Sequence, residues 1–188
     1  MSTPPRRRDA ARNQDRILAV ARELVDEGVP LQLNDVARRA GLGVGTVYRH
    51  FPTPEALLET VATPRLTGLA EDGERALAEP DAWLAFSGFL GRVVEAQFGD
   101  AALSPVTAAA EDALPATTEL KRTLWTVGAE LLARVKAAGE VRADLSADDL
   151  VPLMCGIAYA ATVHGGEDRV ATAHRYLATM LAGLRARR

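Results

Sequence analysis

The sequence predicts an all-α protein, in which an N-terminal three-helix helix-turn-helix domain precedes a larger C-terminal helical bundle, about nine helices altogether. Apolar residues recur at spacings of three and four along most of the chain, as on one face of a helix. No stretch alternates apolar and polar residues as a half-buried strand does, and glycines and prolines fall between the periodic segments. These observations favour helices packed on helices.

Composition indicates a globular protein of the reducing cytoplasm. Hydrophobic residues make up 48% of the 188 residues and charged residues 25%. Cys155 is the only cysteine, so no intramolecular disulfide framework is expected. The arginines at positions 6–8 precede no apolar stretch of the kind that a signal peptide needs. The longest apolar run, 150–163, contains Pro152 and is shorter than the ~18 residues of a membrane-spanning helix.

Charge is distributed unevenly along the chain. Residues 1–53 contain nine arginines against six acidic residues, whereas residues 54–188 contain thirteen basic against nineteen acidic residues. A basic first part on an acidic body is expected when only one end of a protein meets phosphate groups.

The N-terminal part is predicted to consist of an arm and three helices. Residues 1–12, rich in proline and arginine, are expected to form a flexible basic arm. A helix follows from Asn13 to near Gly28, because its apolar residues share one face. Two short helices are predicted over 34–40 and 44–51, and the domain is expected to end at residue 53.

Two helices and a loop-rich stretch are predicted next. One helix starts at Pro54, a favourable first-turn residue, and Pro64 is expected to kink or break it because proline removes a backbone donor. Another helix starts at Asp81, whose carboxylate can cap it. Residues 99–116 are expected to surround one short helix.

Three further helices complete the predicted bundle. Apolar residues over 120–135 define one helix, which ends at Gly139. Ser146 is the expected cap of the next, which a Gly165-Gly166 pair ends. The last helix carries its apolar residues over 170–184.

Residues 34–51, NDVARRAGLGVGTVYRHF, have the pattern of a helix-turn-helix unit. Gly41 can take the left-handed conformation that ends one helix and lets the next leave at a steep angle. Ala37 is small where the two helices cross, and Leu42 is expected to anchor the turn in the core. Such a unit places its second helix in the major groove of double-stranded DNA.

The second helix of this unit has polar side chains on the side away from the core. Donors or aromatic edges are supplied by Thr46, Tyr48, Arg49 and His50. Hydroxyl and imidazole groups suit phosphates, and a guanidinium suits guanine or phosphate. Val47 and Phe51, four residues apart, are expected to face inward. The alternative is a surface helix that is merely polar.

Residues 13–60 resemble the DNA-binding domain of TetR-family transcriptional regulators. The likeness is carried by the ungapped run AGLGVGTVYRHFP at 40–52 and by EALL at 55–58. It implies that phosphates are contacted by Thr46, Tyr48 and His50. It implies that the bases lie nearest to Val44, Gly45 and Arg49. Arg38 or Arg39 is implied to touch the DNA backbone from the preceding helix.

Three positions depart from the family pattern. Gly43 and Gln32 stand where a capping serine or threonine is frequent, and Pro54 stands where a lysine often reaches phosphate. These losses bear on the affinity for DNA more than on the mode of binding. The arginines of the arm could replace the lost DNA contacts by following the DNA backbone or by entering a minor groove. These arginines are Arg6, Arg7, Arg8 and Arg12. The alternative is that the arm is a solvated tail.

The resemblance implies that residues 54–188 form a ligand-binding and dimerisation domain, and this part has a fainter likeness to the SbtR-like subgroup. Residues 150–163 are apolar on nearly every face, so their helix needs cover on all sides. Close helix approach would be permitted by Gly156, Ala158, Ala160 and Ala161. A homodimer through the last two helices is expected, the alternative being a monomer with a central core helix.

A small-molecule effector of unknown identity is expected to bind in the C-terminal domain. The candidate lining residues are Trp83, Phe86, Phe89, Trp125, Met154 and Tyr159. Few charged residues fall within the predicted apolar stripes, so a largely apolar effector is expected. The alternative is that these side chains are plain core.

The predicted function is a repressor that an effector releases from a palindromic operator. The alternatives are an effector-independent DNA-binding protein and, more remotely, an all-helical enzyme. Cys155 lies mid-helix in an apolar run and is expected to be inert. No metal-ligand spacing is matched by His164, Glu167, Asp168 and His174. With no phosphate loop, dinucleotide fingerprint or nucleophile elbow either, no catalytic residue, metal or cofactor is expected.

Overall fold

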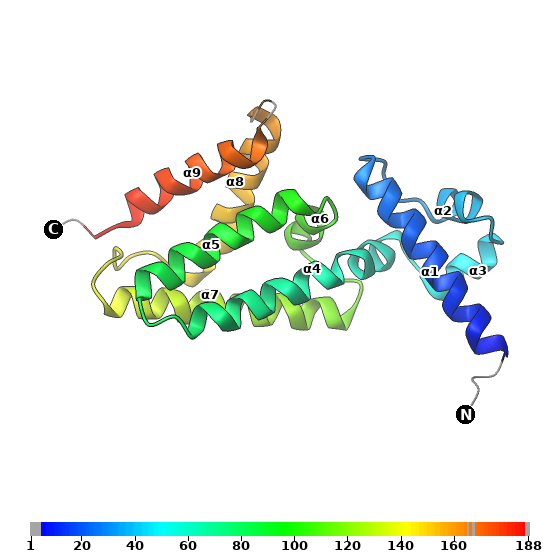
Figure 1. Cartoon of the computed structure of the whole chain (residues 1–188), viewed down its shortest axis with the longest axis horizontal. Helices are drawn as coiled ribbons and strands as arrows, with labels where there is room; N and C mark the ends of the chain where they lie inside the picture. The colour runs from blue at the N-terminus through cyan, green and yellow to red at the C-terminus, as the bar shows by residue number, and fades with distance from the viewer. Residues whose placement is uncertain (1–4, 165, 167, 187–188) are drawn as a thin grey trace.

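The described residues of this computed structural model, 5–164, 166 and 168–186, contain nine α-helices and one 3-10 helix. The N-terminal helices, at one end of the molecule in Figure 1, are α1 Pro5–Asp26, α2 Leu33–Ala40 and α3 Val44–His50. The others are α4 Pro54–Leu77, α5 Ala82–Gly99, α6 Leu103–Ala108, α7 Pro115–Ala137, η1 Ala147–Asp149, α8 Leu150–His164 and α9 Arg169–Leu184. The only β pairing among the described residues is an isolated bridge between Val141 and Arg185. The all-α prediction is confirmed.

The first helix begins earlier than predicted. α1 starts at Pro5 rather than at Asn13, so residues 5–12 are helical where a flexible arm was expected. Proline is favourable in a first turn, arginine and alanine are good helix formers, and no breaker follows before Asn13. The rest of the expected arm, residues 1–4, lies outside the described residues.

The turn between α2 and α3 has the predicted geometry. Gly41 has a φ of 61° and donates its N–H to carbonyls of the last turn of α2. Neither N-cap residue, Gln32 of α2 or Gly43 of α3, makes a side-chain capping bond. Arg16 of α1 donates to the carbonyl of Ala40 and so satisfies an acceptor at the end of α2. The steep turn therefore depends on a glycine backbone and on support from α1.

One hydrophobic core joins the three N-terminal helices to α4 and α6. Fully or nearly fully buried members come from each of these helices: Ile17, Val36, Val47, Leu57 and Leu103. Leu69, three turns further along α4, belongs to the same core. Beyond Leu69, α4 packs against α7. The two helices are close at Gly73, where an added Cβ would lie 2.8 Å from a methyl group of Val127. α4 is thus the physical link between the N-terminal helices and the body.

α4 continues through its internal proline. The prediction allowed a kink or a break at Pro64, and the break is wrong, because a single helix runs from Pro54 to Leu77. Pro64 is exposed, so water can serve the carbonyl of Thr60 that loses its usual donor. Thr53 caps the start of this helix by accepting the N–H of Ala56 at 3.1 Å.

A second core lies between α5, α7, α8 and α9. Its most deeply buried members include Phe86, Leu131, Val135, Ala161 and Ala173. The predicted caps of these helices are present. Asp81 accepts the N–H of Leu84 at 2.8 Å, and Ser146 forms a capping box with Asp149 at η1, which leads directly into α8. The predicted short helix within 99–116 is α6.

Candidate nucleic-acid interface and effector cavity

α3 turns one face to the core and the other to solvent. Val47 is fully buried and Phe51, which follows the helix, is nearly so, as predicted from their spacing. The solvent-exposed residues of α3 are Val44, Gly45, Tyr48 and Arg49, with Thr46 and His50 half-buried. In Figure 1, α3 lies at the end of the molecule away from α5, α7 and α9. The exposed residues of α3 therefore lie on the part of the molecule that is remote from the body.

Arg49 is folded back along its own helix. Its Nε donates to the carbonyl of Gly45 at 2.9 Å, and Nη2 lies 3.4 Å from Oγ1 of Thr46. These exposed contacts are of the kind that a phosphate or a guanine edge can replace.

The two arginines of α2 are exposed and paired. Arg39 donates to both carboxylate oxygens of Glu27, at 2.8 and 3.1 Å, and Arg38 pairs with Asp35 at 2.8 Å. Exposed pairs of this kind contribute only ~0–1 kcal/mol, so exchanging a carboxylate for a DNA phosphate costs little. Both arginines are therefore held only by exposed ion pairs.

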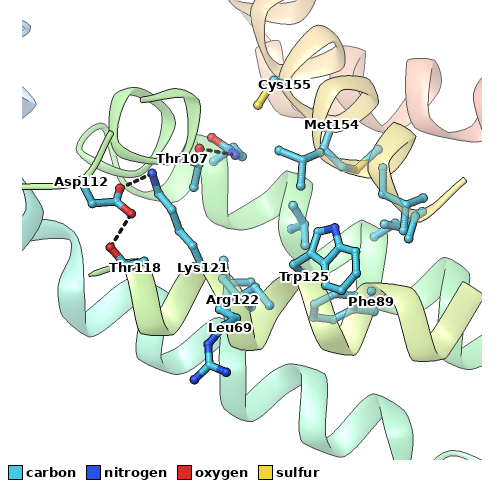
Figure 2. A pocket seen from close by; sticks show the side chains of 18 residues that line it. Leu69, Phe89, Thr107, Asp112, Thr118, Lys121, Arg122, Trp125, Met154 and Cys155 are labelled. Atoms are coloured by element: carbon cyan, nitrogen blue, oxygen red, sulfur yellow. Dashed lines mark hydrogen bonds and ion pairs between the residues drawn. The ribbon is translucent and has the colours of Figure 1, made fainter. Parts of the chain in front are cut away.

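A cavity of about 420 Å³ lies in the C-terminal body. Its walls come from α4, α5, α6, α7, η1 and α8, which Figure 2 shows converging on one space. Apolar walls are formed by Leu69, Phe89, Leu90, Val93, Leu124, Trp125, Gly128, Ala147, Leu150, Val151, Met154 and Cys155. The volume is in the range of small-molecule sites, ~300–1,000 Å³.

Polar side chains gather at one end of this cavity. Lys121 of α7 makes an ion pair with Asp112 and donates to the carbonyl of Ala109 at 3.2 Å. Thr118 donates to the other oxygen of Asp112 at 3.0 Å. Figure 2 shows this group on the side of the cavity opposite Phe89. The remaining polar lining residues are Gln97, Thr107 and Arg122.

Three of the six predicted pocket residues line the cavity, namely Phe89, Trp125 and Met154. The other three do not, and this corrects the expectation. Phe86 faces the second core and is 1% exposed, whereas Tyr159 is 73% exposed on the outer face of α8. Trp83 is covered by Arg185, whose guanidinium carbon lies 3.6 Å from the ring centroid. Helical periodicity places a residue on a face but does not say what that face meets.

Sequence reasoning missed the polar end of the cavity. Asp112 lies in the segment between α6 and α7, Lys121 on α7 and Gln97 on α5. Charged and amide side chains were expected outside the apolar stripes, so no pattern marked them. The polar residues at the start of α7 gave no signal either, because several of them are exposed, as polar residues on a helix surface usually are.

Cys155 lines the cavity, and burial raises the pKa of its thiol, while the positive charge of Lys121 opposes the rise. Because the thiolate is the reactive form, we expect alkylation by iodoacetamide to be slow at neutral pH and to reach its half-maximal rate above pH 9.0, the ordinary value. Rates measured across pH 7 to 11, with glutathione as the reference thiol, test this. The expectation would be contradicted if Cys155 reached its half-maximal rate at a lower pH than glutathione does.

The histidine region at the end of α8 has ordinary structural contacts. Asp168 caps α9 by accepting the N–H of Ala171 at 2.9 Å, and Nε2 of His174 lies 3.7 Å from a carboxylate oxygen of Glu95. Glu167, also part of this group, lies outside the described residues. In the described part of the chain no three histidine, cysteine or acidic side chains are close enough to hold a metal ion.

None of the described helices has the length and apolar character needed to cross a membrane.

The exposed α3 at the end of a helix-turn-helix unit, on a helical body with a cavity, defines a DNA-binding regulatory protein. Two family descriptions match the chain. Residues 17–61 match "Bacterial regulatory proteins, tetR family", and residues 79–186 match "Transcriptional regulator SbtR-like, C-terminal domain". The chain belongs to the TetR family of transcriptional regulators.

Solved structures and curated relatives are similar to this chain. A TetR transcriptional regulator from Streptomyces coelicolor is 32% identical, with a TM-score of 0.58, over 93% of this chain and 99% of that one. FadR from Bacillus subtilis, solved with stearoyl-CoA, is 18% identical with a TM-score of 0.66, over 90% and 98% of the two chains. An HTH-type transcriptional regulator of Staphylococcus aureus is 32% identical over 81 residues, and the chain covers only 42% of its length.

Proposed function

We propose that the protein is a dimeric repressor that leaves a palindromic operator when a small molecule fills the cavity of its C-terminal body. The observation that carries the proposal is the position of Leu69. This residue of α4 lines the cavity and belongs to the core that also contains Val47 of α3. A change in the cavity can therefore act on the element that supports the DNA-reading helix.

A second contact ties the N-terminal helices to the body. Arg22 of α1 pairs with Asp100, at the end of α5, at 2.5 Å, and also donates to the carbonyl of Val61 on α4 at 2.6 Å. Asp100 in turn accepts the N–H of Ala102 at the start of α6. Packed cores and polar links of this kind move between discrete arrangements, so an effector that prefers one arrangement shifts the population.

The cavity favours this function over an effector-independent DNA-binding protein. A fully packed C-terminal body would suit a protein that binds DNA constitutively, whereas this body contains a space of about 420 Å³ with a polar end. Bacillus subtilis FadR, a structural neighbour, was solved with stearoyl-CoA, which supports a small-molecule ligand for a protein of this fold.

The proposed dimer forms through the outer faces of α8 and α9. Exposed residues on α8 recur at spacings of four, three and four: Pro152, Gly156, Tyr159 and Val163. On α9 the exposed residues include Ala178, Ala182 and Gly183, which permit close helix approach. Two such helices from each protomer would make a four-helix bundle about a two-fold axis.

Tyr159→Glu is expected to convert the dimer into a monomer. The side chain is 73% exposed in one protomer, and at a two-fold contact its replacement puts a carboxylate on each side of an apolar interface. Light scattering coupled to size-exclusion chromatography measures the mass. Val29→Glu introduces the same charge at another exposed apolar position, 37% exposed between α1 and α2, and should leave the dimer intact. A dimeric Tyr159→Glu protein would exclude this interface.

Selection of bound sequences from a random duplex library tests the proposed function. We expect a short palindrome with half-sites about one helical turn, ~34–36 Å, apart. A small-molecule extract should abolish the enrichment if the protein is released by an effector. No enrichment at low salt would refute sequence reading, and enrichment that no extract changes would favour the effector-independent alternative.

Arg49→Ala is expected to weaken operator binding by ~1–3 kcal/mol and to relax the preference at one base pair, if its guanidinium reads a guanine. Fluorescence anisotropy on the selected palindrome and on its single-base variants measures both effects. Arg75→Ala is the matched control, because Arg75 is an exposed arginine of α4 paired with Asp72 at 2.6 Å, away from α3. If Arg49→Ala weakened binding equally on every DNA sequence, Arg49 would instead contact a phosphate.

A further inference from the structure

The size of the cavity suits a small ligand. Its volume of about 420 Å³ holds a molecule of roughly a dozen non-hydrogen atoms, if each takes the ~30 Å³ that a water occupies in the liquid. Most of that molecule must be apolar, because the walls offer Phe89, Trp125, Met154 and their aliphatic neighbours. Only the end near Lys121 offers polar contacts.

The charges around the cavity cancel. Among its described lining residues the charged ones are Asp112, Lys121 and Arg122. Asp112 and Lys121 neutralise each other as an ion pair. Arg122 pairs with Glu119 at 2.5 Å, and Figure 2 shows its guanidinium pointing away from the cavity. A ligand in this space meets no net charge.

At the polar end both oxygens of Asp112 already accept a hydrogen bond each, and N–H donors remain. One oxygen of Asp112 accepts from Lys121 and the other from Thr118. Lys121 has three N–H groups, of which Asp112 and the Ala109 carbonyl use two. The geometry leaves the third for a ligand.

Gln97 of α5 adds a second donor. It is 8% exposed, its Oε1 accepts from Ser104 at 2.7 Å, and its Nε2 donates to Thr107 at 3.2 Å. An amide nitrogen carries two N–H groups, so one is left for a ligand. A buried donor without an acceptor is costly, which favours a ligand that supplies an oxygen.

We infer that the effector is an uncharged amphipathic molecule whose carbonyl oxygen, as in a ketone, ester or lactone, accepts from Lys121 and Gln97. The inference rests on the proposed sensor function and adds the chemical class of the ligand. A carboxylate would be buried beside Asp112, and like charges in one site repel. An amine would place a second ammonium group beside Lys121, and like charges in one site repel.

A set of straight-chain probes with eleven carbons and different head groups tests this inference. The probes are the methyl ketone, the carboxylic acid, the primary amine and the alkane. Fluorescence of Trp125 reports binding to the full-length protein, with Trp83→Phe removing the other tryptophan. We expect the ketone to bind at least about tenfold more tightly than the other three, as one or two hydrogen bonds predict.

Two variants connect the ketone preference to the proposed donors. The first variant is Gln97→Leu. The second combines Lys121→Met with Asp112→Asn, so that no carboxylate is left without its partner. Each variant should weaken ketone binding about tenfold and leave alkane binding unchanged. Gln14→Leu, an exposed glutamine of α1, is the matched control and should change neither.

The outcomes separate the ligand class from the sensor function. Acid or alkane binding as tight as ketone binding would overturn the inference, as would binding of none of the four probes. Release of the selected operator is measured in parallel. Ketone binding in the expected order without operator release would retain the inferred ligand chemistry and refute the proposed sensor function.

Discussion

Phe86→Ala is expected to lower the free energy of unfolding by about 3–5 kcal/mol, because it leaves a cavity in a packed core. Phe86 is 1% exposed and lies among the residues that α5 shares with α7, α8 and α9. Urea unfolding followed by circular dichroism measures the change. The protomer concentration must be held constant, since the stability of an oligomer depends on it.

Leu84→Ala is the matched control for Phe86→Ala. Leu84 lies two residues earlier on α5 and is 57% exposed, so its truncation should change the free energy of unfolding by less than about 0.5 kcal/mol. A loss below about 1 kcal/mol for Phe86→Ala would contradict the core position of this ring. Unchanged probe binding in a folded variant would support its place outside the cavity.

Glu59→Ala is expected to destabilise the protein by about 3 kcal/mol, since charge-assisted hydrogen bonds contribute ~1.5–3 kcal/mol each. Glu59 of α4 is 4% exposed, and its carboxylate accepts the N–H of Ala113 at 2.6 Å and of Leu114 at 2.8 Å. These two amides precede α7, whose N-cap residue, Leu114, has no capping side chain. Glu59 therefore caps α7 from another helix and places a negative charge at its positive end.

Glu74→Ala is the matched control, because Glu74 is an exposed glutamate of the same helix. Urea unfolding should separate the two variants by at least about 2 kcal/mol. Glu59→Gln keeps one acceptor oxygen and should fall between them. Equal stabilities of the alanine variants would mean that water replaces the carboxylate without cost.

The polar contacts of Glu59 also concern the cavity. The segment that Glu59 holds includes Asp112, whose carboxylate pairs with Lys121 at the polar end. Glu59 and Asp112 thus connect α4, which supports α3, to the end of the cavity where the ligand head group is proposed to bind. No local pattern marks Glu59, since its partners lie more than fifty positions away along the chain.

Much of the helix-turn-helix unit could be predicted because its determinants are local. Gly41 ends α2 in the left-handed conformation, and Val47 and Phe51 face inward, as their spacing within one short segment indicates. The start of α1 was predicted too late. The proline and arginines before Asn13 were interpreted as an arm, although nothing in them breaks a helix.

The sequence by itself determined the all-α class, the order of the helices and the polar face of α3. These features depend on apolar periodicity and on caps within a few residues, such as Asp81 and Ser146. Only the tertiary structure decided which apolar faces enclose a cavity and which fill a core. Phe86 and Phe89 both belong to the second core, but only Phe89 also lines the cavity, where Lys121, Asp112 and Gln97 come together. The reason is physical: periodicity gives the direction of a side chain from its helix, whereas its surroundings depend on packing between helices distant in the chain.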